Sequence, residues 1–246
     1  NDGGDIAIHL APGHQLRAGI VADLQAPQLS GFATLHHDPE AGSGQGEPIL
    51  REQITEVMAE VGIKAHPDDV VVTMGSKEGL ASLATAITAP GDVVLAPNPS
   101  YPIHTFGFII AGATIRSVPT TPDENYFRSL ERAMAFTVPR PSILVVNYPS
   151  NPTAETVDLA FYERLVAWAK ENKVWILSDL AYSELYFDGN PTPSILQVKG
   201  GKDVAVEFTS LSKTYSMAGW RIGFAVGNRE LIAAMTRLGL PTEVPG

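Results

Sequence analysis

Residues 204–227 read VAVEFTSLSKTYSMAGWRIGFAVG. Two β-branched runs, at 204–210 and 221–227, flank a short polar segment that carries one lysine, Lys213, and is followed by Arg221. Runs of this length and composition predict buried β-strands. A lysine placed directly after a buried strand lies at the sheet edge where α/β proteins bind ligands, so this stretch indicates a fold class and a site together.

The same alternation extends outward along the chain. Five further short apolar runs occur at 70–74, 92–97, 114–119, 142–147 and 173–179. Segments with helical periodicity lie between or beside them, at 50–62, 77–88, 124–135 and 157–172. β-Branched runs that alternate with helices predict an α/β domain with a mostly parallel sheet flanked by helices.

The composition limits the class of protein. Of 246 residues, 44% are hydrophobic and 18% are charged, which is typical of a globular protein with a sizeable core. The net charge of −10 argues against sequence-independent nucleic-acid binding. Cysteine is absent, which excludes disulfides and cysteine nucleophiles, and no metal site is predicted. The lack of a long apolar run or a signal-peptide pattern predicts a cytoplasmic protein without membrane contact.

Small and charged residues follow the run at 70–74. Gly75 permits a sharp turn, and Ser76 and Lys77 open a helix whose N-terminal N–H groups can cradle a phosphate. The alternative is an ordinary strand-to-helix turn with Ser76 as its N-cap. After the next run, Tyr101 offers a ring that can stack on a flat ligand, and simple packing is the alternative.

Two further strands end in polar groups. Asn151 presents an amide, although a turn capped by Thr153 or Thr156 is the alternative. Asp179 ends an almost wholly apolar run, where an ionised carboxylate is costly unless it is paired, and Tyr182 can face the same side. A buried carboxylate can hold a ring nitrogen protonated, whereas a simple N-cap aspartate is the alternative.

Lys213 has the hydroxyl residues Ser210, Ser212 and Thr214 as neighbours, in an apolar context that favours a neutral, nucleophilic amine. Arg221 can bind a phosphate bidentately. Taken alone, a lysine is more often simply solvated. Together, a lysine that can trap an aldehyde, a carboxylate for a pyridine nitrogen, donors for a phenolic oxygen, a stacking ring and a phosphate cradle describe a site for pyridoxal phosphate.

Five motifs extend this interpretation to a family. They occur in the order VTMGSKEGL, PNPSYPIHTFG, NYPSNPTA, SDLAYSELYFDG and SLSKTYSMAGWRIGF. On these motifs, residues 50–239 resemble the fold-type I pyridoxal-phosphate-dependent aminotransferases of the aspartate aminotransferase superfamily. SNPTA and the stretch KDVAVEFTSLSKTYSMAGWRIGFAVGN are most similar to bacterial alanine (glutamate–pyruvate) aminotransferases. Relatives that act on other amino acids are the alternative within the family.

The resemblance implies a role for each candidate residue. Lys213 matches the lysine that forms a Schiff base with the cofactor and serves as general base, and Asp179 matches the aspartate on the pyridine nitrogen. Tyr182 and Asn151 match the donors to the cofactor's 3-oxygen, and Tyr101 matches the ring stacked on the pyridine. The remaining candidates match the phosphate contacts of the family: Gly75, Ser76, Lys77, Ser210 and Arg221.

The resemblance also implies three parts of the chain. Residues 1–49 are expected to be an N-terminal arm and small-domain remnant, 50–239 the large cofactor-binding domain, and 240–246 a truncated or altered end. The family has a tyrosine near residue 50 that reaches the neighbouring subunit, yet no tyrosine precedes Tyr101. The family's arginine for the substrate carboxylate belongs to a C-terminal small domain, of which only remnants are expected, so a truncated chain is predicted.

The expected function is transfer of an amino group between an L-amino acid, alanine or glutamate, and a 2-oxo acid, with ping-pong kinetics. The resemblance implies a homodimer, because active sites of the family are shared between subunits. Three alternatives stand beside this expectation. They are a lyase or decarboxylase on the same cofactor, a non-catalytic module that binds pyridoxal phosphate, and a structural α/β domain without a cofactor.

Overall fold

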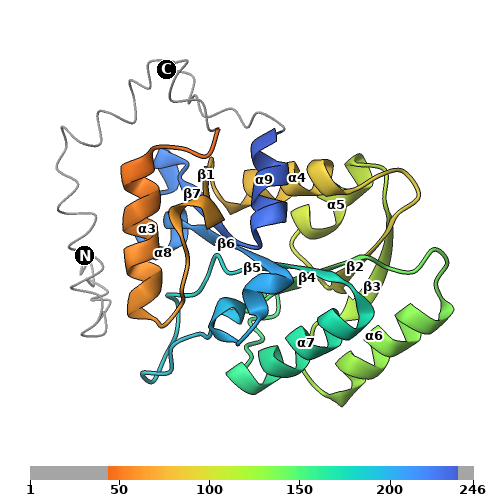
Figure 1. Ribbon diagram of the computed structural model, residues 1–246. Helices are drawn as coiled ribbons and strands as arrows, with labels where there is room; N and C mark the ends of the chain where they lie inside the picture. Colours follow the sequence, from red (N-terminus) through yellow and green to blue (C-terminus); the bar gives the residue numbers. More distant parts are fainter. Residues whose placement is uncertain (1–43, 238–246) are drawn as a thin grey trace, which may run out of the picture.

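The computed structural model describes residues 44–237 (Figure 1). Most of the predicted N-terminal part and all of the predicted end at 240–246 lie outside the described residues, so the three-part division stays a prediction. Within the described range, no helix is long and apolar enough to cross a membrane.

One sheet of seven strands forms the centre of the described part. Its strands lie in the order β1 (Val70–Thr73), β7 (Gly223–Gly227), β6 (Ala205–Ser210), β5 (Trp175–Asp179), β4 (Ile143–Asn147), β2 (Val93–Asn98) and β3 (Thr114–Pro119). Strands β2 to β6 pair in parallel, whereas β7 runs antiparallel to both β6 and β1. Each of the seven apolar runs forms one of these strands, which confirms the predicted mostly parallel sheet.

Helices cover both faces of this sheet (Figure 1). They are α3 (Pro48–Glu60), α4 (Ser76–Ile87), α5 (Ile103–Ile110), α6 (Glu124–Phe136), α7 (Leu159–Asn172), α8 (Leu211–Thr214) and α9 (Arg229–Arg237). Short 3-10 turns occur at η1 (Pro67–Asp69), η2 (Ile195–Gln197), η3 (Gly201–Asp203) and η4 (Ala218–Trp220). Asp158 caps α7 by accepting the N–H of Phe161, so neither Thr153 nor Thr156 is the cap of this helix.

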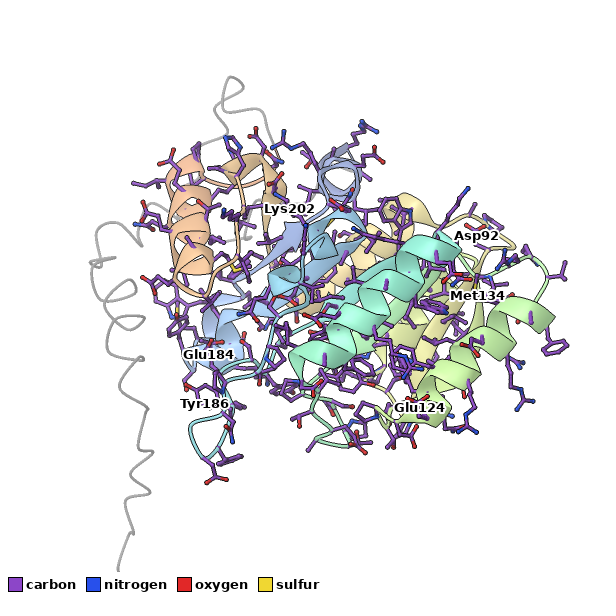
Figure 2. The ribbon with its side chains drawn as sticks, turned by 60° about the horizontal axis from the view of Figure 1, so that its bottom comes forward. Asp92, Glu124, Met134, Glu184, Tyr186 and Lys202 are labelled. Atoms are coloured by element: carbon purple, nitrogen blue, oxygen red, sulfur yellow. The ribbon has the colours of Figure 1, made fainter. Side chains whose placement is uncertain are left out.

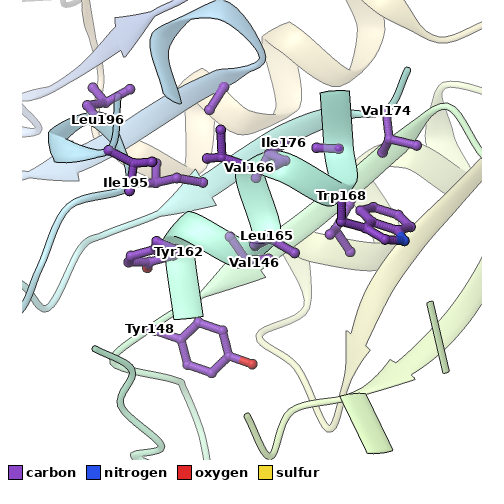
Figure 3. Packing of buried hydrophobic residues seen from close by; sticks show 14 of the residues in the cluster. Val146, Tyr148, Tyr162, Leu165, Val166, Trp168, Val174, Ile176, Ile195 and Leu196 are labelled. Atoms are coloured by element: carbon purple, nitrogen blue, oxygen red, sulfur yellow. The ribbon is translucent and has the colours of Figure 1, made fainter. Parts of the chain in front are cut away.

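Alternate side chains of the central strands enter two hydrophobic clusters. In β4, Ile143 and Val145 belong to the cluster with α4, α5 and α9, whereas Leu144 and Val146 belong to the cluster with α6 and α7. Figure 3 shows Val146 of the second cluster among the side chains of α7 and the neighbouring strands. Because both faces are covered, the central strand β4 is apolar at every position from Ile143 to Val146, which explains why it reads as a continuous hydrophobic run.

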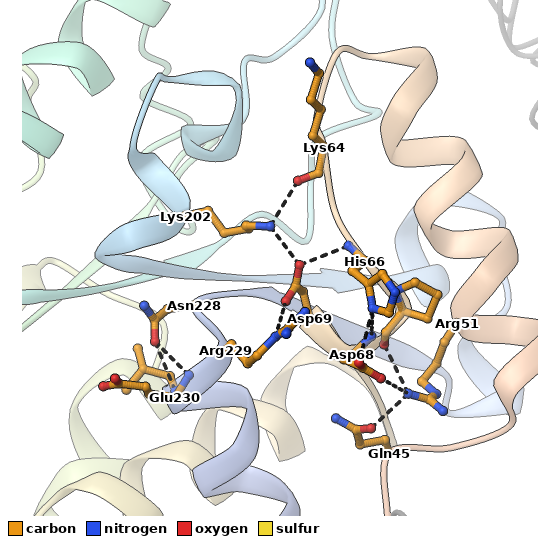
Figure 4. Close-up of polar contacts among 12 residues, drawn as sticks. Gln45, Arg51, Lys64, His66, Asp68, Asp69, Lys202, Asn228, Arg229 and Glu230 are labelled. Atoms are coloured by element: carbon orange, nitrogen blue, oxygen red, sulfur yellow. Dashed lines mark hydrogen bonds and ion pairs between the residues drawn. The ribbon is translucent and has the colours of Figure 1, made fainter.

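Asp69 joins three segments beside β1 (Figure 4). Its buried carboxylate lies 2.7 Å from Lys202 Nζ of η3 and 3.0 Å from Arg229 Nε at the start of α9. It also accepts the backbone N–H of His66 at 2.9 Å. Burial raises the pKa of Asp69, but the bonds from Lys202, His66 and Arg229 outweigh this effect and lower the pKa below its usual value.

We predict that Asp69→Asn destabilises the chain by about 1–3 kcal/mol at pH 7, because charged hydrogen bonds to two cations are lost. The folded pKa of Asp69 is depressed, so its contribution is present above the ordinary pKa of 3.8 and is lost as the pH falls through the folded pKa. Urea unfolding at pH 7 and at pH 3 measures both effects. The control Asp203→Asn removes an exposed pair with Lys170 and is expected to cost less than about 1 kcal/mol. Equal losses in the two variants would contradict the prediction.

Glu207 of β6 is a second buried carboxyl, only 2% exposed, on the face of the sheet that carries α7. It accepts bonds from Ser194 Oγ at 2.6 Å, from Ser178 Oγ at 3.3 Å and from the N–H of Ile195 at 3.3 Å. Burial outweighs these bonds and raises the pKa of Glu207 to about 7. Its buried neighbour Tyr162 also has a raised pKa, first through burial and then through the charge of Glu207.

The raised pKa of Glu207 makes stability depend on pH. Below pH 4.5 the group is protonated in both states, and between pH 4.5 and 7 only the unfolded chain ionises, so stability falls as the pH rises. We predict that Glu207→Gln gains about 3 kcal/mol relative to the native chain between pH 4 and pH 8. Urea titrations at both values test this, with the exposed Glu56→Gln of α3 as control. A constant difference between Glu207→Gln and the native chain at the two pH values would contradict it.

Candidate active site

The strand ends line up at one edge of the sheet. Asn147 of β4 pairs with Asp179 of β5, and Gly223 of β7 pairs with Ser210 on one side and Thr73 on the other. Since β7 is antiparallel, its first residues lie at the edge where the parallel strands finish. The turns after β1, β4, β5 and β6 and the segment before β7 therefore meet, and they carry most of the predicted site residues: Gly75, Ser76, Lys77, Asn151, Asp179, Tyr182, Ser210, Lys213 and Arg221.

Gly75 and Arg221 form the first part of the site. Gly75 has a φ of +88° and precedes Ser76, the first residue of α4, so Ser76 is not the N-cap. A Cβ atom on Gly75 would stand 2.8 Å from Arg221 Nη2, and that nitrogen donates to the carbonyl of Met74 at 3.2 Å. The guanidinium thus lies beside the N-terminal turn of α4, where Lys77 is exposed. The arrangement combines a helix N-terminus and an arginine, a setting suited to an anion.

Asp179 is paired with a histidine that the sequence reasoning missed. His104 Nε2 lies 2.9 Å from Asp179 Oδ2, and the two side chains are 0% and 6% exposed. Within the described residues, His104 Nδ1 has no hydrogen-bond partner. The rings of Tyr101 and His104 pack edge-to-face, with 5.9 Å between their centres. The signal in the sequence was a polar residue, His104, within the apolar helix IHTFGFII, three residues after Tyr101. His104 supplies the partner that a buried carboxylate such as Asp179 requires.

Asn147 is a second residue that the sequence reasoning missed. Its Nδ2 donates to the carbonyl oxygens of Asp179 at 2.8 Å and Pro149 at 3.2 Å, while its Oδ1 accepts the N–H of Asn151 at 2.8 Å. It is 4% exposed, so these bonds are protected from water. One amide therefore fixes the turn that carries Asn151 relative to the end of β5.

Tyr182 lies between Asn151 and Lys213. Asn151 Nδ2 donates to the Tyr182 hydroxyl at 3.4 Å, and Lys213 Nζ lies 5.9 Å from the centre of the Tyr182 ring. Lys213 is exposed, which corrects the expectation of apolar surroundings: α8 is a single turn with no buried residue, so its lysine faces outward from the sheet edge. Ser210 is buried before α8. Tyr182 is therefore the residue that lies next to both Asn151 and Lys213.

The family model for aminotransferase class I and II matches residues 26–245. The chain belongs to the class I and II aminotransferases. A putative aminotransferase AatC from Rhizobium meliloti (strain 1021) is 53% identical over 223 residues, which cover 88% of this chain and 55% of that protein. The glutamate-pyruvate aminotransferase AlaC of Escherichia coli (strain K12) is 46% identical over 216 residues, 87% of this chain and 50% of that protein.

Solved structures of this aminotransferase family agree with the fold. The crystal structure of an aspartate aminotransferase from Thermotoga maritima matches with a TM-score of 0.71 and 32% identity, over 80% of this chain and 52% of that one. The chain spans about half the length of the curated relatives it matches.

The close approach of Gly75 to Arg221 generates a prediction. Gly75→Ala is expected to displace the guanidinium and to weaken binding of inorganic phosphate about tenfold or more, since the added methyl group occupies the gap between them. Gly91→Ala is the matched control, because Gly91 also has a positive φ, of +97°, but no atom within 4 Å of the added Cβ. For both variants, phosphate affinity is measured by calorimetric titration, and the free energy of unfolding is measured with urea. Both variants should lose about 1 kcal/mol of stability; unchanged phosphate binding in Gly75→Ala would contradict the prediction.

Proposed function

We propose that the chain binds pyridoxal phosphate and acts as an aminotransferase between an L-amino acid and a 2-oxo acid. The observation that carries the proposal is the buried Asp179–His104 pair, which lies at the same sheet edge as the exposed Lys213 and the turn of Gly75 beside Arg221. Membership of the aminotransferase family supports the same function. The pyridine nitrogen, the aldehyde and the phosphate of one cofactor would thus each meet a suitable group at the same edge of the sheet.

The fit to the cofactor's phosphate rests on the space between Gly75 and Arg221, which a side chain at Gly75 would fill. Arg221 and the N–H groups at the start of α4 would hold the phosphate, with Ser76, Lys77 and Ser210 at the same edge. The positive charge of this turn contrasts with the net charge of −10 for the whole chain. It provides a local site for an anion in an acidic protein.

The fit to the cofactor's ring rests on Asp179. Its carboxylate would hold the pyridine nitrogen protonated, and the hydrogen bond with His104 holds that carboxylate in position. Tyr182 and Asn151 would donate to the phenolic oxygen, and Tyr101 would cover the ring face. When bound, the cofactor supplies an electron sink for the bonds at the amino acid's Cα.

Lys213 is the proposed catalytic base and the covalent attachment point for the cofactor. Its exposed Nζ, beside Tyr182, is placed to take the Cα proton of an incoming amino acid once the amine is neutral. Over two half-reactions the donor amino acid becomes a 2-oxo acid, and the acceptor 2-oxo acid becomes an amino acid. The donor product leaves before the acceptor binds, so ping-pong kinetics follow.

Alanine and glutamate are the proposed amino donors, with pyruvate among the acceptors, since the name of the 46% identical relative specifies glutamate and pyruvate. Aspartate is the second candidate, from the aminotransferase structure that is 32% identical. The proposal includes a cytoplasmic homodimer and the division into parts at residues 1–49, 50–239 and 240–246. A lyase or decarboxylase on the same cofactor differs in its product, and a non-catalytic module differs in forming none.

The test uses the 246-residue chain with pyridoxal phosphate. The native chain is expected to show the visible absorption of a lysine-bound cofactor, which changes on addition of L-alanine or L-glutamate as a 2-oxo acid forms. Lys213→Ala should lose both signals, whereas Lys199→Ala, at an exposed lysine outside the site, should keep them. Asp179→Asn should lose about 100-fold or more in turnover, equivalent to about 3 kcal/mol of activation free energy.

Each outcome separates the alternatives. Absorption that stays unchanged with every amino acid would assign the chain to the non-catalytic binding modules. Release of carbon dioxide or of ammonia in place of amino transfer would assign it to the decarboxylases or lyases. Full activity of Lys213→Ala would overturn the proposed role of this lysine.

A further inference from the structure

A cavity of about 510 Å³ lies on the face of the sheet covered by α3. One wall is formed by α3, a second by residues 180–197 after β5, and the floor by β6, β7 and α8. Figure 2 shows Glu184 and Tyr186 of this wall on the loop at the α3 side of the molecule. Its volume falls in the range of pockets that enclose small molecules.

The cavity is distinct from the proposed cofactor site. None of the candidate cofactor residues lines it. Leu211 and Thr214, which flank Lys213 in α8, nevertheless do, and so do Leu180 and Ser183, which lie on both sides of Tyr182. The cavity therefore adjoins the segments of the proposed site without sharing their functional side chains.

The lining combines apolar side chains with acidic groups. Most lining residues are apolar, including Ile54, Val57 and Phe224. Within residues 44–237, the acidic residues that line the cavity are Glu184 and Glu207, and the lining contains no lysine, arginine or histidine. Since the charged groups that the described residues contribute to this apolar chamber are carboxyls, the chamber favours a cation over an anion of the same shape. It is thus unsuited to a phosphate or to the carboxylate of an amino acid.

Glu207 gives the cavity a fixed polar group. Its carboxyl is held by Ser178, Ser194 and the N–H of Ile195, so its position is set before a ligand arrives. The raised pKa of about 7 leaves this carboxyl ionised in mildly alkaline solution. Tyr162 stays neutral beside it, and Glu184 is the other acid of the wall.

We propose that this cavity binds an apolar primary amine, with the hydrocarbon body against α3 and the ammonium group at Glu207. The amine would bind independently of pyridoxal phosphate. It would contact α8, which carries Lys213, and the segment around Tyr182, through residues other than these two. Burial of the hydrocarbon supplies the affinity, and the carboxyl selects the charge of the head group.

The test compares three probes with the same hydrocarbon body: 4-phenylbutylammonium, 4-phenylbutanol and 4-phenylbutyrate. Each is titrated calorimetrically at pH 8 into the full 246-residue chain without cofactor. The ammonium probe is expected to bind about tenfold more tightly than the alcohol, since a charge-assisted bond adds roughly one tenfold step, and the carboxylate is expected to bind most weakly.

Two variants assign the binding to this cavity. Glu207→Gln should reduce the affinity for the ammonium probe about tenfold and leave that for the alcohol unchanged, whereas Glu56→Gln, at an exposed site on α3, should alter neither. Val57→Trp places an indole in the chamber and should abolish binding of all three probes. Since the probe series is run on the native chain, the proposal stays falsifiable if Glu207→Gln does not fold.

Several results would overturn the proposal. They are equal affinities for the ammonium and carboxylate probes, no binding of any probe, an ammonium affinity unaffected by Glu207→Gln, and binding that survives Val57→Trp. Self-association of the native chain that Val57→Trp removes, with no probe bound, would assign the cavity to a second copy instead. A missing cofactor signal in the aminotransferase test has no bearing on these titrations, so the two proposals fail separately.

Discussion

Gly223 is the point on which the arrangement of the site depends. It pairs with Thr73 of β1 and with Ser210 of β6, and a Cβ atom there would stand 2.7 Å from the Thr209 carbonyl oxygen and 2.8 Å from Gly75 Cα. Only hydrogen fits in this space. The close contact brings the turn that opens α4, the end of β6 and the segment of Arg221 to one place. The groups proposed to bind an anion therefore come from segments far apart in sequence.

The sheet could be predicted from the sequence because each strand is a short run rich in β-branched or other apolar residues, and the central strands are buried on both faces. The positions of the site residues could also be predicted, since polar groups follow each run and parallel strands finish at one edge. The roles of Asn147 and His104 could not. Asn147 acts through bonds to Asp179, Pro149 and Asn151, which the folded turn brings together. The packing of α5 that brings His104 to Asp179, 75 residues along the chain, is likewise a property of the folded protein.

The two buried carboxyls, Asp69 and Glu207, have pKa values shifted in opposite directions, although burial raises the pKa of both. Asp69 is close to Lys202 and Arg229, so its charged form is favoured although it is buried. Glu207 receives only neutral donors, which do not compensate for the loss of water. Neither outcome was visible in the sequence, where both residues stand next to apolar runs. The difference comes from the cations that the fold does or does not bring to each.

The pairing of Ser210 with Gly223, and the bond from the N–H of Leu211 to the carbonyl of Ile222 at 3.1 Å, close the loop that contains Lys213 into a hairpin. The two ends of this loop are therefore held together by the sheet. Lys213 and Arg221 thus lie on one loop with tethered ends, and near the far end Arg221 Nη2 donates to the carbonyl of Met74 at 3.2 Å. A change in the length of segment 211–222 would therefore move both side chains relative to the start of α4.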